Sequence, residues 1–307
     1  MSDLDEVWIG VDVGGTSVRA GVMRRSGELL GPLLDLRREA DIESQLDQIA
    51  GVLTELATAA STRIVATGLA LPGSIDPLTG RLSSAPTAPA LLDWNPHCGV
   101  LAQAGAVRLL NDANAALLGE WHFGTARGSA DVVALFVGTG TGADVIINGE
   151  MLVGSRGIGG ELGHIVVAPG YGPDCPCGGS GCLEQLASGT AIARRYAELS
   201  GQLADGSASV AEAALRGDLA AQQAFAEAGR WLGLAAASLA NIFNPQVIVI
   251  GGGAAAAWDL LAPTSRAAVE RHTMPLAAQG LQVRPGSLSR NAGVIGAAVA
   301  SQELGKW

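Results

Sequence analysis

The chain has 307 residues, of which 48% are hydrophobic and 16% charged, and this composition excludes an intrinsically disordered protein. Its 29 acidic against 19 basic residues give a net charge of −10, which argues against a protein that binds nucleic acid or docks on an anionic membrane. The 43 glycines are about twice the average share, so the backbone must approach something closely at several places.

The first residues are acidic and lack the basic region of a signal peptide, and no apolar run approaches the ~18 residues of a membrane helix. We therefore expect a cytoplasmic protein. Three of the four cysteines lie within residues 175–182, and in a reducing compartment such a cluster is more typical of a metal site than of disulfides. The fourth, Cys98, is expected to be a small buried hydrophobe.

The first half predicts a strand, a glycine-rich turn and a second strand, followed by alternating helices and strands. Apolar periodicity indicates strands at 7–13, 18–23, 63–71 and 107–110 and helices at 41–60 and 111–121. The stretch 76–96 is rich in Pro, Thr and Ser and predicts a long loop, which is often functional.

The second half repeats this plan at low sequence identity. A strand at 131–137, a glycine turn at 138–142 and a strand at 143–147 precede a loop, the cysteine cluster and helices across 184–243. An apolar strand at 246–250 ends in three glycines, and a helix follows residue 291. The chain is therefore predicted to be α/β, with an internal strand–turn–strand repeat.

Glycine and threonine turns at strand ends can bind phosphate, because successive backbone N–H groups form a concave anion site and glycine has no Cβ to block it. Asp12 beside the first turn could hold Mg²⁺. A single such turn is as readily an ordinary hairpin turn, but their repetition favours a split nucleotide site. The candidate contacts are Asp12, Gly14, Gly15, Thr16, Gly138, Thr139, Gly140, Thr141, Gly252 and Gly253.

Cys175, Cys177 and Cys182 supply three thiolates on a short glycine-rich loop, and His164 is the nearest upstream histidine. Together they would form a closed structural zinc site of the Cys₃His type. The alternative is three thiols without a metal.

Four motifs carry a family resemblance: DVGGT at 12–16, GTGTG at 138–142, GELGH at 160–164 and CPCGGSGCLE at 175–184. In this order they resemble the ROK family of bacterial sugar kinases and transcriptional repressors, and the glucokinase branch most. The resemblance implies a two-lobed actin/hexokinase-like fold, which is a duplicated ribonuclease H-like unit, with ATP in the interlobe cleft. We expect a small lobe of residues 1–115 plus about 292–307, and a large lobe of 116–291 with the zinc loop.

The resemblance also assigns roles. Spacing alone favours Asp112 as a helix N-cap, whereas the family pattern makes it the catalytic base. The implied zinc shapes the sugar pocket and leaves the second nitrogen of His164 for a sugar hydroxyl. Expected sugar contacts are Gly73, Thr87, Asn111, Glu161, His164 and Glu184.

Two positions depart from the family pattern. Thr87 stands where many members have an asparagine that touches the sugar, which leaves the exact hexose open. Asp144 stands where the family often has glycine, and we expect it to place a negative charge near the phosphate turn.

The resulting prediction is an ATP-dependent hexose kinase that uses Mg²⁺ and most closely matches a glucokinase acting on the 6-hydroxyl. The alternatives are an N-acetylglucosamine or N-acetylmannosamine kinase and a non-catalytic sugar-binding regulatory protein. A repressor is disfavoured, because the first strand begins near residue 7 and leaves no room for a DNA-binding domain.

Dimers are common in the family, so a homodimer or higher homo-oligomer is expected. The sequence leaves open the use of polyphosphate as donor and any regulation.

Overall fold

The computed structural model describes residues 5–95 and 105–302, so Cys98 lies outside the described residues. The described chain forms two compact units: unit 1 runs to residue 127 and includes 153–159 and the residues from 291 on, and unit 2 contains 128–152 and 160–290. The expected boundary near residue 115 differs, because helix α3 (Asp112–Phe123) packs along α10 (Ala292–Gln302) and stays whole within unit 1. In the described part of the chain, no helix combines the length and apolar character needed to cross a bilayer.

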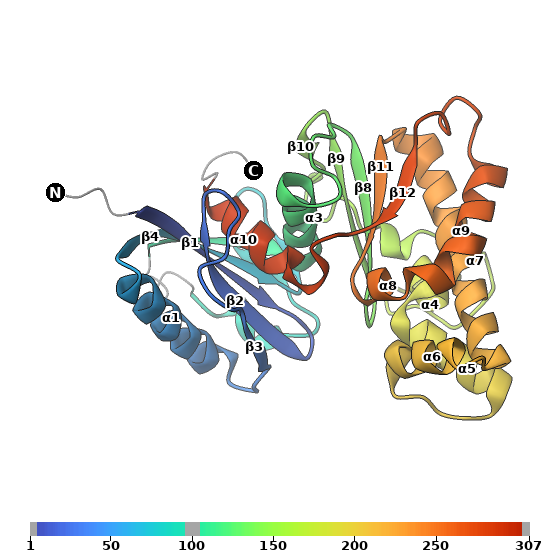
Figure 1. The fold of residues 1–307 in the computed structure, drawn as a ribbon, viewed down its shortest axis with the longest axis horizontal. Coiled ribbons are helices and arrows are strands. Elements are labelled where there is room, and N and C mark those ends of the chain that lie inside the picture. The colour runs from blue at the N-terminus through green and yellow to red at the C-terminus, as the bar shows by residue number, and fades with distance from the viewer. Residues whose placement is uncertain (1–4, 96–104, 303–307) are drawn as a thin grey trace. The chain divides into compact units, whose positions relative to one another are not determined.

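Unit 1 is built on a five-stranded sheet of order β3-β2-β1-β4-β7. Figure 1 labels β1, β2, β3 and β4 of this sheet. Strand β1 pairs antiparallel with β2 and parallel with β4, which pairs parallel with β7. The four strands predicted in this half are confirmed, and the predicted loop at 76–96 contains β6 and a short 3₁₀ helix, η1. The strand bounds are β1 Asp5–Val13, β2 Ser17–Arg24, β3 Leu34–Arg37, β4 Thr62–Leu71, β5 Ser74–Ile75, β6 Leu82–Ser84 and β7 Ala106–Asn111, and η1 spans Pro89–Leu92.

Each face of the unit 1 sheet is covered by a helix. Alternate residues of β1, such as Ile9 and Val11, are buried with Leu46 of α1 (Ile42–Ala59) in one hydrophobic cluster. On the other face Gly10 and Gly68 are paired across β1 and β4, and a Cβ on either would lie about 2 Å from a carbonyl oxygen of α10. The two glycines therefore allow the α10 backbone to rest directly on the sheet.

Unit 2 repeats the arrangement, with a five-stranded sheet of order β10-β9-β8-β11-β12. Strand β8 occupies the place of β1, because it pairs antiparallel with the next strand, β9, and parallel with β11. The predicted internal repeat is thus confirmed at the level of sheet topology. The bounds are β8 Val132–Val137, β9 Thr141–Ile147, β10 Glu150–Met151, β11 Val247–Gly251 and β12 Gln282–Pro285.

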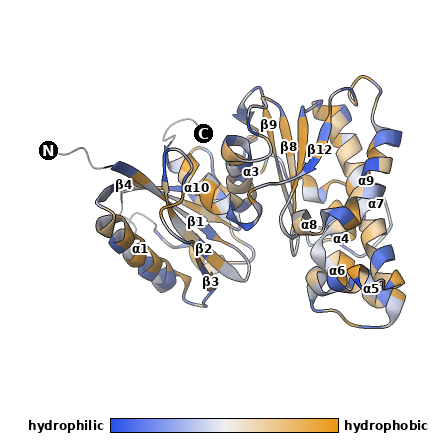
Figure 2. Cartoon of the chain, in the orientation of Figure 1, coloured by the Kyte–Doolittle hydropathy of each residue, from blue (hydrophilic) through white to orange (hydrophobic). Residues whose placement is uncertain are grey.

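The core of unit 2 lies between this sheet and a layer of helices. Apolar residues of β8, β9 and β11 form one buried cluster with residues of α4, α5, α6, α7 and α9, and Figure 2 shows the hydrophobic residues along β8. The bounds are α4 Leu183–Ala187, α5 Gly189–Ser200, α6 Gly206–Leu215, α7 Leu219–Phe243, α8 Gly253–Ala256 and α9 Trp258–His272, with 3₁₀ helices η2 at Leu162–His164 and η3 at Ser289–Asn291.

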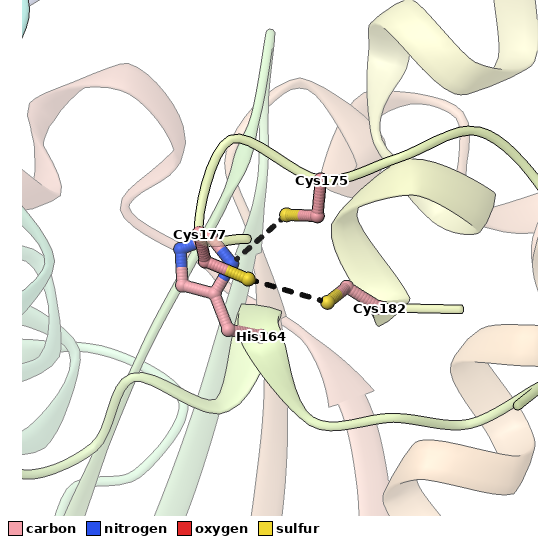
Figure 3. A group of neighbouring side chains, drawn as sticks. All are labelled: His164, Cys175, Cys177 and Cys182. Carbon is pink, nitrogen blue, oxygen red and sulfur yellow. Dashed lines mark hydrogen bonds between the residues drawn. The ribbon is translucent and has the colours of Figure 1, made fainter. Parts of the chain in front are cut away.

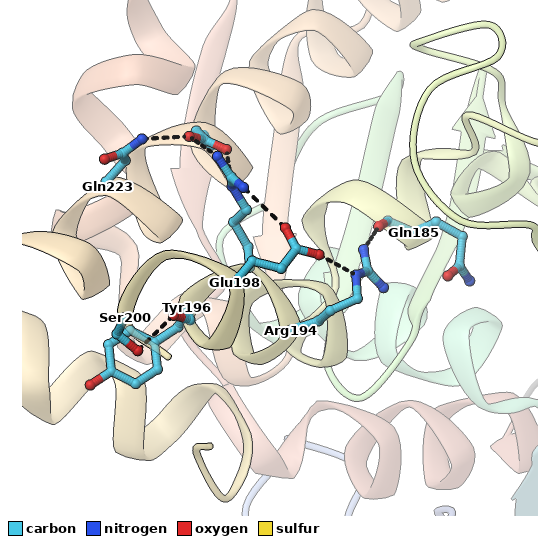
Figure 4. A network of polar contacts seen from close by, with 8 residues as sticks. Gln185, Arg194, Tyr196, Glu198, Ser200 and Gln223 are labelled. Atoms are coloured by element: carbon cyan, nitrogen blue, oxygen red, sulfur yellow. Dashed lines mark hydrogen bonds and ion pairs between the residues drawn. The ribbon is translucent and has the colours of Figure 1, made fainter. Parts of the chain in front are cut away.

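A polar network ties α4, α5 and α7 together (Figure 4). Arg195 on α5 donates two hydrogen bonds to Glu227 on α7, at 2.7 and 3.1 Å, and a third to Glu198 at 3.0 Å. Arg194 donates to the backbone carbonyl of Gln185 on α4. The short helix that follows the cysteine loop is therefore held to the larger helices of unit 2.

Candidate active site

The turn between β1 and β2 is held by backbone contacts. The amide of Gly14 donates to the carbonyl of Ser17 at 2.8 Å, and the Arg38 guanidinium donates to the Gly14 carbonyl at 3.1 Å. Gly15 and Thr16 are exposed, and apart from Gly15 and its two chain neighbours no described residue has an atom within 4 Å of where a Gly15 Cβ would be. This part of the turn is open to a ligand such as phosphate.

Arg38 was not among the predicted site residues, and no motif marks it. Its second guanidinium nitrogen donates to the carbonyl of Thr87 at 2.6 Å, so one side chain joins the Gly14 turn to the predicted sugar contact. The Thr87 side chain is exposed and so remains accessible to a ligand.

Asp12, at the end of β1, is a largely buried carboxyl group with a second carboxylate nearby. Its side chain is only 15% exposed, and Gly293 of α10 packs so closely that a Cβ there would lie 2.5 Å from the carboxylate. Burial, and then repulsion by Asp112, raise the pKa of Asp12 to about 6, although Arg19 at 3.8 Å acts against this. Two neighbouring carboxylates of this kind favour a divalent cation such as Mg²⁺.

Asn111 and Asp112 open helix α3 with different roles. The Asn111 side chain is the N-cap: its oxygen accepts from the amides of Ala113 and Asn114 at 2.8 and 3.2 Å, and its nitrogen donates to the Gly73 carbonyl at 3.0 Å. The alternative that Asp112 is the N-cap is therefore wrong. Asp112 lies in the first turn, where the helix dipole favours its charged form.

Two hydrogen bonds from the start of helix α5 hold the glycine turn of unit 2. The amide of Gly189 donates to the Gly138 carbonyl at 2.7 Å, and the Thr190 hydroxyl donates to the Thr139 carbonyl at 2.8 Å. With these two carbonyl groups engaged by α5, the shape of the turn is set, and the exposed Thr139 side chain remains free to meet a ligand.

The glycines after β11 lie beside this turn. Gly252 has φ of +70°, and a Cβ there would lie 2.6 Å from the carbonyl oxygen of Val137, the residue before Gly138. Strands β8 and β11 are parallel neighbours, so their carboxyl ends meet at one edge of the sheet. The structure thus brings together the predicted contacts Gly138 to Gly140 and Gly252 with Gly253.

Thr141 and Glu184 meet in a way that the sequence did not suggest. The amide of Thr141 donates to the Glu184 carboxylate at 2.9 Å, and a Cβ on Gly140 would lie 2.5 Å from the same oxygen. Thr141 is buried, so both its amide and its side chain are withheld from a nucleotide. In this turn the exposed residues are better placed for phosphate than Thr141 is.

The predicted metal ligands form one cluster (Figure 3). Nδ1 of His164 lies 3.4 Å from Sγ of Cys175, the sulfurs of Cys177 and Cys182 lie 3.6 Å apart, and all four ligand atoms fall within 4.8 Å of one another. Neighbouring ligands of a tetrahedral zinc ion are about 3.5–3.8 Å apart, so this donor set fits zinc. Burial raises the pKa of the Cys182 thiol to about 12, so a cation is needed to keep that sulfur ionised.

The cysteine loop also brings predicted sugar contacts together. Cys182 forms a β-bridge with Val166, and the amide of Leu183 donates to the Ile165 carbonyl at 3.0 Å, which places the segment before Glu184 against the segment after His164. Glu161 lies one turn before His164, whose amide donates to the Glu161 carbonyl at 3.1 Å. Glu161 is exposed, and Glu184 and His164 are half-buried.

The expectation for Asp144 is wrong in one respect. Its side chain is fully buried within β9 instead of adding an exposed charge to the phosphate turn. Burial raises the pKa of Asp144 well above its usual value and so disfavours its charged form.

Comparison with known proteins shows the family to which the chain belongs. The ROK family model matches residues 8–303. The chain is 37% identical to a glucokinase of Thermotoga maritima over 313 residues, which covers 96% of this chain and 97% of that protein. Among solved structures, the ROK hexokinase of Thermus thermophilus aligns at 33% identity and a TM-score of 0.79, covering 96% of this chain and 98% of that one. A ROK glucokinase of Streptomyces griseus, in complex with glucose and AMPPNP, aligns at 31% identity and a TM-score of 0.77, covering 97% and 99%. The chain belongs to the ROK family and has its two-lobed, actin-like fold.

Proposed function

We propose that this protein is an ATP-dependent hexose kinase, and specifically a glucokinase that transfers the γ-phosphoryl group of ATP to the 6-hydroxyl of glucose. The observation that carries the proposal is the start of α3, where Asn111 caps the helix and Asp112 follows in the first turn as the carboxylate that repels Asp12. Similarity to the Thermotoga maritima glucokinase and to the glucose and AMPPNP complex of the Streptomyces griseus enzyme supports it.

Asp112 acts as the general base. Phosphoryl transfer has a loose transition state, so the base is needed late, when the sugar oxygen is already bonding to phosphorus. Asn111 supports this role, because its contact with the Gly73 carbonyl fixes the strand end from which Asp112 emerges. The helix dipole favours the charged form of a carboxylate in the first turn, and a charged carboxylate can accept the proton.

The two glycine turns bind the nucleotide. In unit 1 the open positions Gly15 and Thr16 offer amide and hydroxyl donors, and in unit 2 Thr139 with its flanking glycines offers the same groups. Asp12 would hold Mg²⁺, which would supply positive charge to the phosphates. A cation bound there would offset the repulsion between Asp12 and Asp112.

Unit 2 contributes Glu161, His164 and Glu184 to sugar recognition, and unit 1 contributes Gly73, Thr87 and Asn111. Each carboxylate accepts from a hydroxyl, and the loss of one such buried hydrogen bond costs about 1–3 kcal/mol. A structural zinc bound by the four clustered ligands would hold the segments that carry Glu161, His164 and Glu184 in place. Because Nδ1 of His164 faces Cys175, its Nε2 is left for a hydroxyl.

We also propose that the protein is a homodimer or higher homo-oligomer. Ile242, Met274 and Leu276 are each more than 60% exposed, and Asn241 hydrogen-bonds to the backbone of His272 and Met274, which joins these segments. A grouping of exposed apolar residues is typical of a contact surface. Sedimentation velocity over a range of protein concentration measures the state directly, and a monomer at all concentrations would contradict the proposal.

A coupled ADP-release assay over glucose, mannose, fructose, N-acetylglucosamine and N-acetylmannosamine tests the function. We expect glucose to give the highest kcat/KM. A preference for an N-acetylated sugar would instead identify a hexosamine kinase, and sugar binding in calorimetry without ADP release would identify a non-catalytic binding protein.

A further inference from the structure

Asp144 is a buried carboxyl group with an unsatisfied oxygen. It is 0% exposed on β9, its Oδ1 accepts from the amide of the next residue, Val145, at 2.7 Å, and its buried Oδ2 has no hydrogen-bond partner among the described residues. A buried polar atom without a partner is destabilising. A residue that keeps such a group at a strand centre calls for a reason other than stability.

The contacts of Asp144 connect it to the segment that carries Glu161, a proposed sugar ligand. Across the β8–β9 ladder it faces Ala134, which carries no charge. On its side chain packs Gly160, where φ is +87° and a Cβ would lie 2.6 Å from Oδ1 and 3.0 Å from the Asp144 Cα. The next residue along the chain is Glu161, which is also the charged neighbour of Asp144.

The Gly160 turn is tight as well as closely packed. The amide of Leu162 donates to the Gly160 carbonyl at 2.6 Å, and the amide of His164 donates to the Glu161 carbonyl at 3.1 Å. The Asp144 side chain is therefore the surface on which this turn rests. A change in its size or charge is passed to the backbone that carries Glu161.

We propose that Asp144 is a positioning residue for Glu161: its carboxyl group supports the Gly160 turn and so sets the direction in which Glu161 meets a sugar hydroxyl. The inference rests on the proposed function, because it takes Glu161 to be a sugar ligand. Ionisation of Asp144 would place a negative charge beside Glu161 and repel that carboxylate.

Two variants separate packing from charge. Asp144→Asn keeps the shape and cannot ionise, so we expect its KM for glucose at pH 7 to stay within about twofold of the wild type. Asp144→Gly removes the support, and we expect the KM for glucose to rise about tenfold, on the scale of one hydrogen bond, with kcat and the KM for ATP little changed. Asp259→Asn, an exposed carboxylate at the start of α9, is the matched control.

The pH profile gives a readout that a purely structural role would not move. As pH rises and Asp144 ionises, the wild-type KM for glucose should increase, while that of Asp144→Asn stays flatter. If Asp144→Gly lowers the melting temperature but leaves the KM for glucose and its pH profile unchanged, the positioning role is refuted although the kinase function stands. If the wild type neither phosphorylates nor binds any hexose, the proposed function itself fails.

Discussion

Replacing Asp112 by asparagine tests the proposed base with little disturbance of the fold. The N-cap bonds of α3 come from Asn111, at 2.8 and 3.2 Å, and they remain in the variant. The hydrogen bond that Asp112 itself accepts from Ala113, at 2.9 Å, can be accepted equally by an asparagine oxygen. Removing a charge that repels Asp12 also favours folding. We therefore expect Asp112→Asn to unfold at or above the wild-type temperature.

Turnover should respond very differently. An asparagine amide cannot accept the hydroxyl proton, and loss of a general base lowers kcat by about 10²–10⁴-fold, which corresponds to about 3–5 kcal/mol in the activation barrier. Glucose binding should stay within a few-fold, because the sugar ligands are other residues. The ADP-release assay measures kcat, and calorimetry measures glucose affinity.

Asp41→Asn is a matched control from the same unit. Asp41 caps α1 by accepting from the Ser44 amide at 3.2 Å and is exposed, so this variant should keep full turnover. Turnover of Asp112→Asn within about tenfold of the wild type would refute the assignment of the base. So would a loss of glucose binding with turnover retained.

Three further predictions concern the metal, the packing and the pH dependence of stability. Cys177→Ser removes one zinc ligand and should lower zinc content and melting temperature together; full zinc occupancy by elemental analysis would contradict the cluster as a zinc site. Gly296→Ala would place a Cβ 1.6 Å from the Ala115 carbonyl oxygen and should destabilise by about 3 kcal/mol or more in urea unfolding. Gly51→Ala in helix α1 should be neutral or slightly stabilising, because outside the adjacent helix backbone no described residue lies within 4 Å of the new Cβ. Because the pKa of Asp12 is raised from 3.8 to about 6, the folded chain holds its proton more tightly than the unfolded chain does. Wild-type stability relative to Asp12→Asn should therefore fall by up to about 3 kcal/mol as pH rises from about 4 to 6, and a pH-independent difference between the two would contradict this.

The strands and the cluster of one histidine and three cysteines could be predicted because their signals are local. The alternation of buried residues in β1 and the apolar run of β11 each follow from a few consecutive residues. The spacing of Cys175, Cys177 and Cys182 limits their sulfurs to a small volume, and the structure places them there with His164. The repeat of strand, glycine turn and strand likewise predicted the topology that both sheets share.

Features that depend on distant residues could not be predicted. The unit boundary follows from the packing of α3 on α10, where a Cβ on Gly119 would lie 2.3 Å from the Ala292 carbonyl oxygen, a contact between residues 173 positions apart in the chain. The hydrogen bond between Thr141 and Glu184 also joins residues that are distant in the chain, a predicted phosphate contact and a predicted sugar contact. Neither residue carries a local signal for the other.

The strand that contains Asp144 was predicted correctly, but the position of the Asp144 side chain was not. The sequence predicted a strand through this residue, and β9 confirms it. Ala143 and Val145 join the hydrophobic cluster under the helices, so the alternation of a strand directs Asp144 to the opposite face. That face is covered by the Gly160 turn, which the sequence predicted only as loop.

The two repeats place their buried carboxyl groups in different electrostatic settings. In unit 1 the ladder between β1 and β2 sets Asp12 opposite Arg19, so a guanidinium partly offsets its burial and the group can still ionise near pH 6. In unit 2 the ladder between β8 and β9 sets Asp144 opposite Ala134, and no cation offsets it across the pair. A carboxyl group that ionises can hold a metal ion, whereas one kept neutral can only pack or donate a proton in a hydrogen bond. The same topology therefore supports cation binding by Asp12 and positioning by Asp144, and the variants Asp12→Asn and Asp144→Asn should separate these roles, the first by lost ATP turnover and the second by an altered pH profile for glucose.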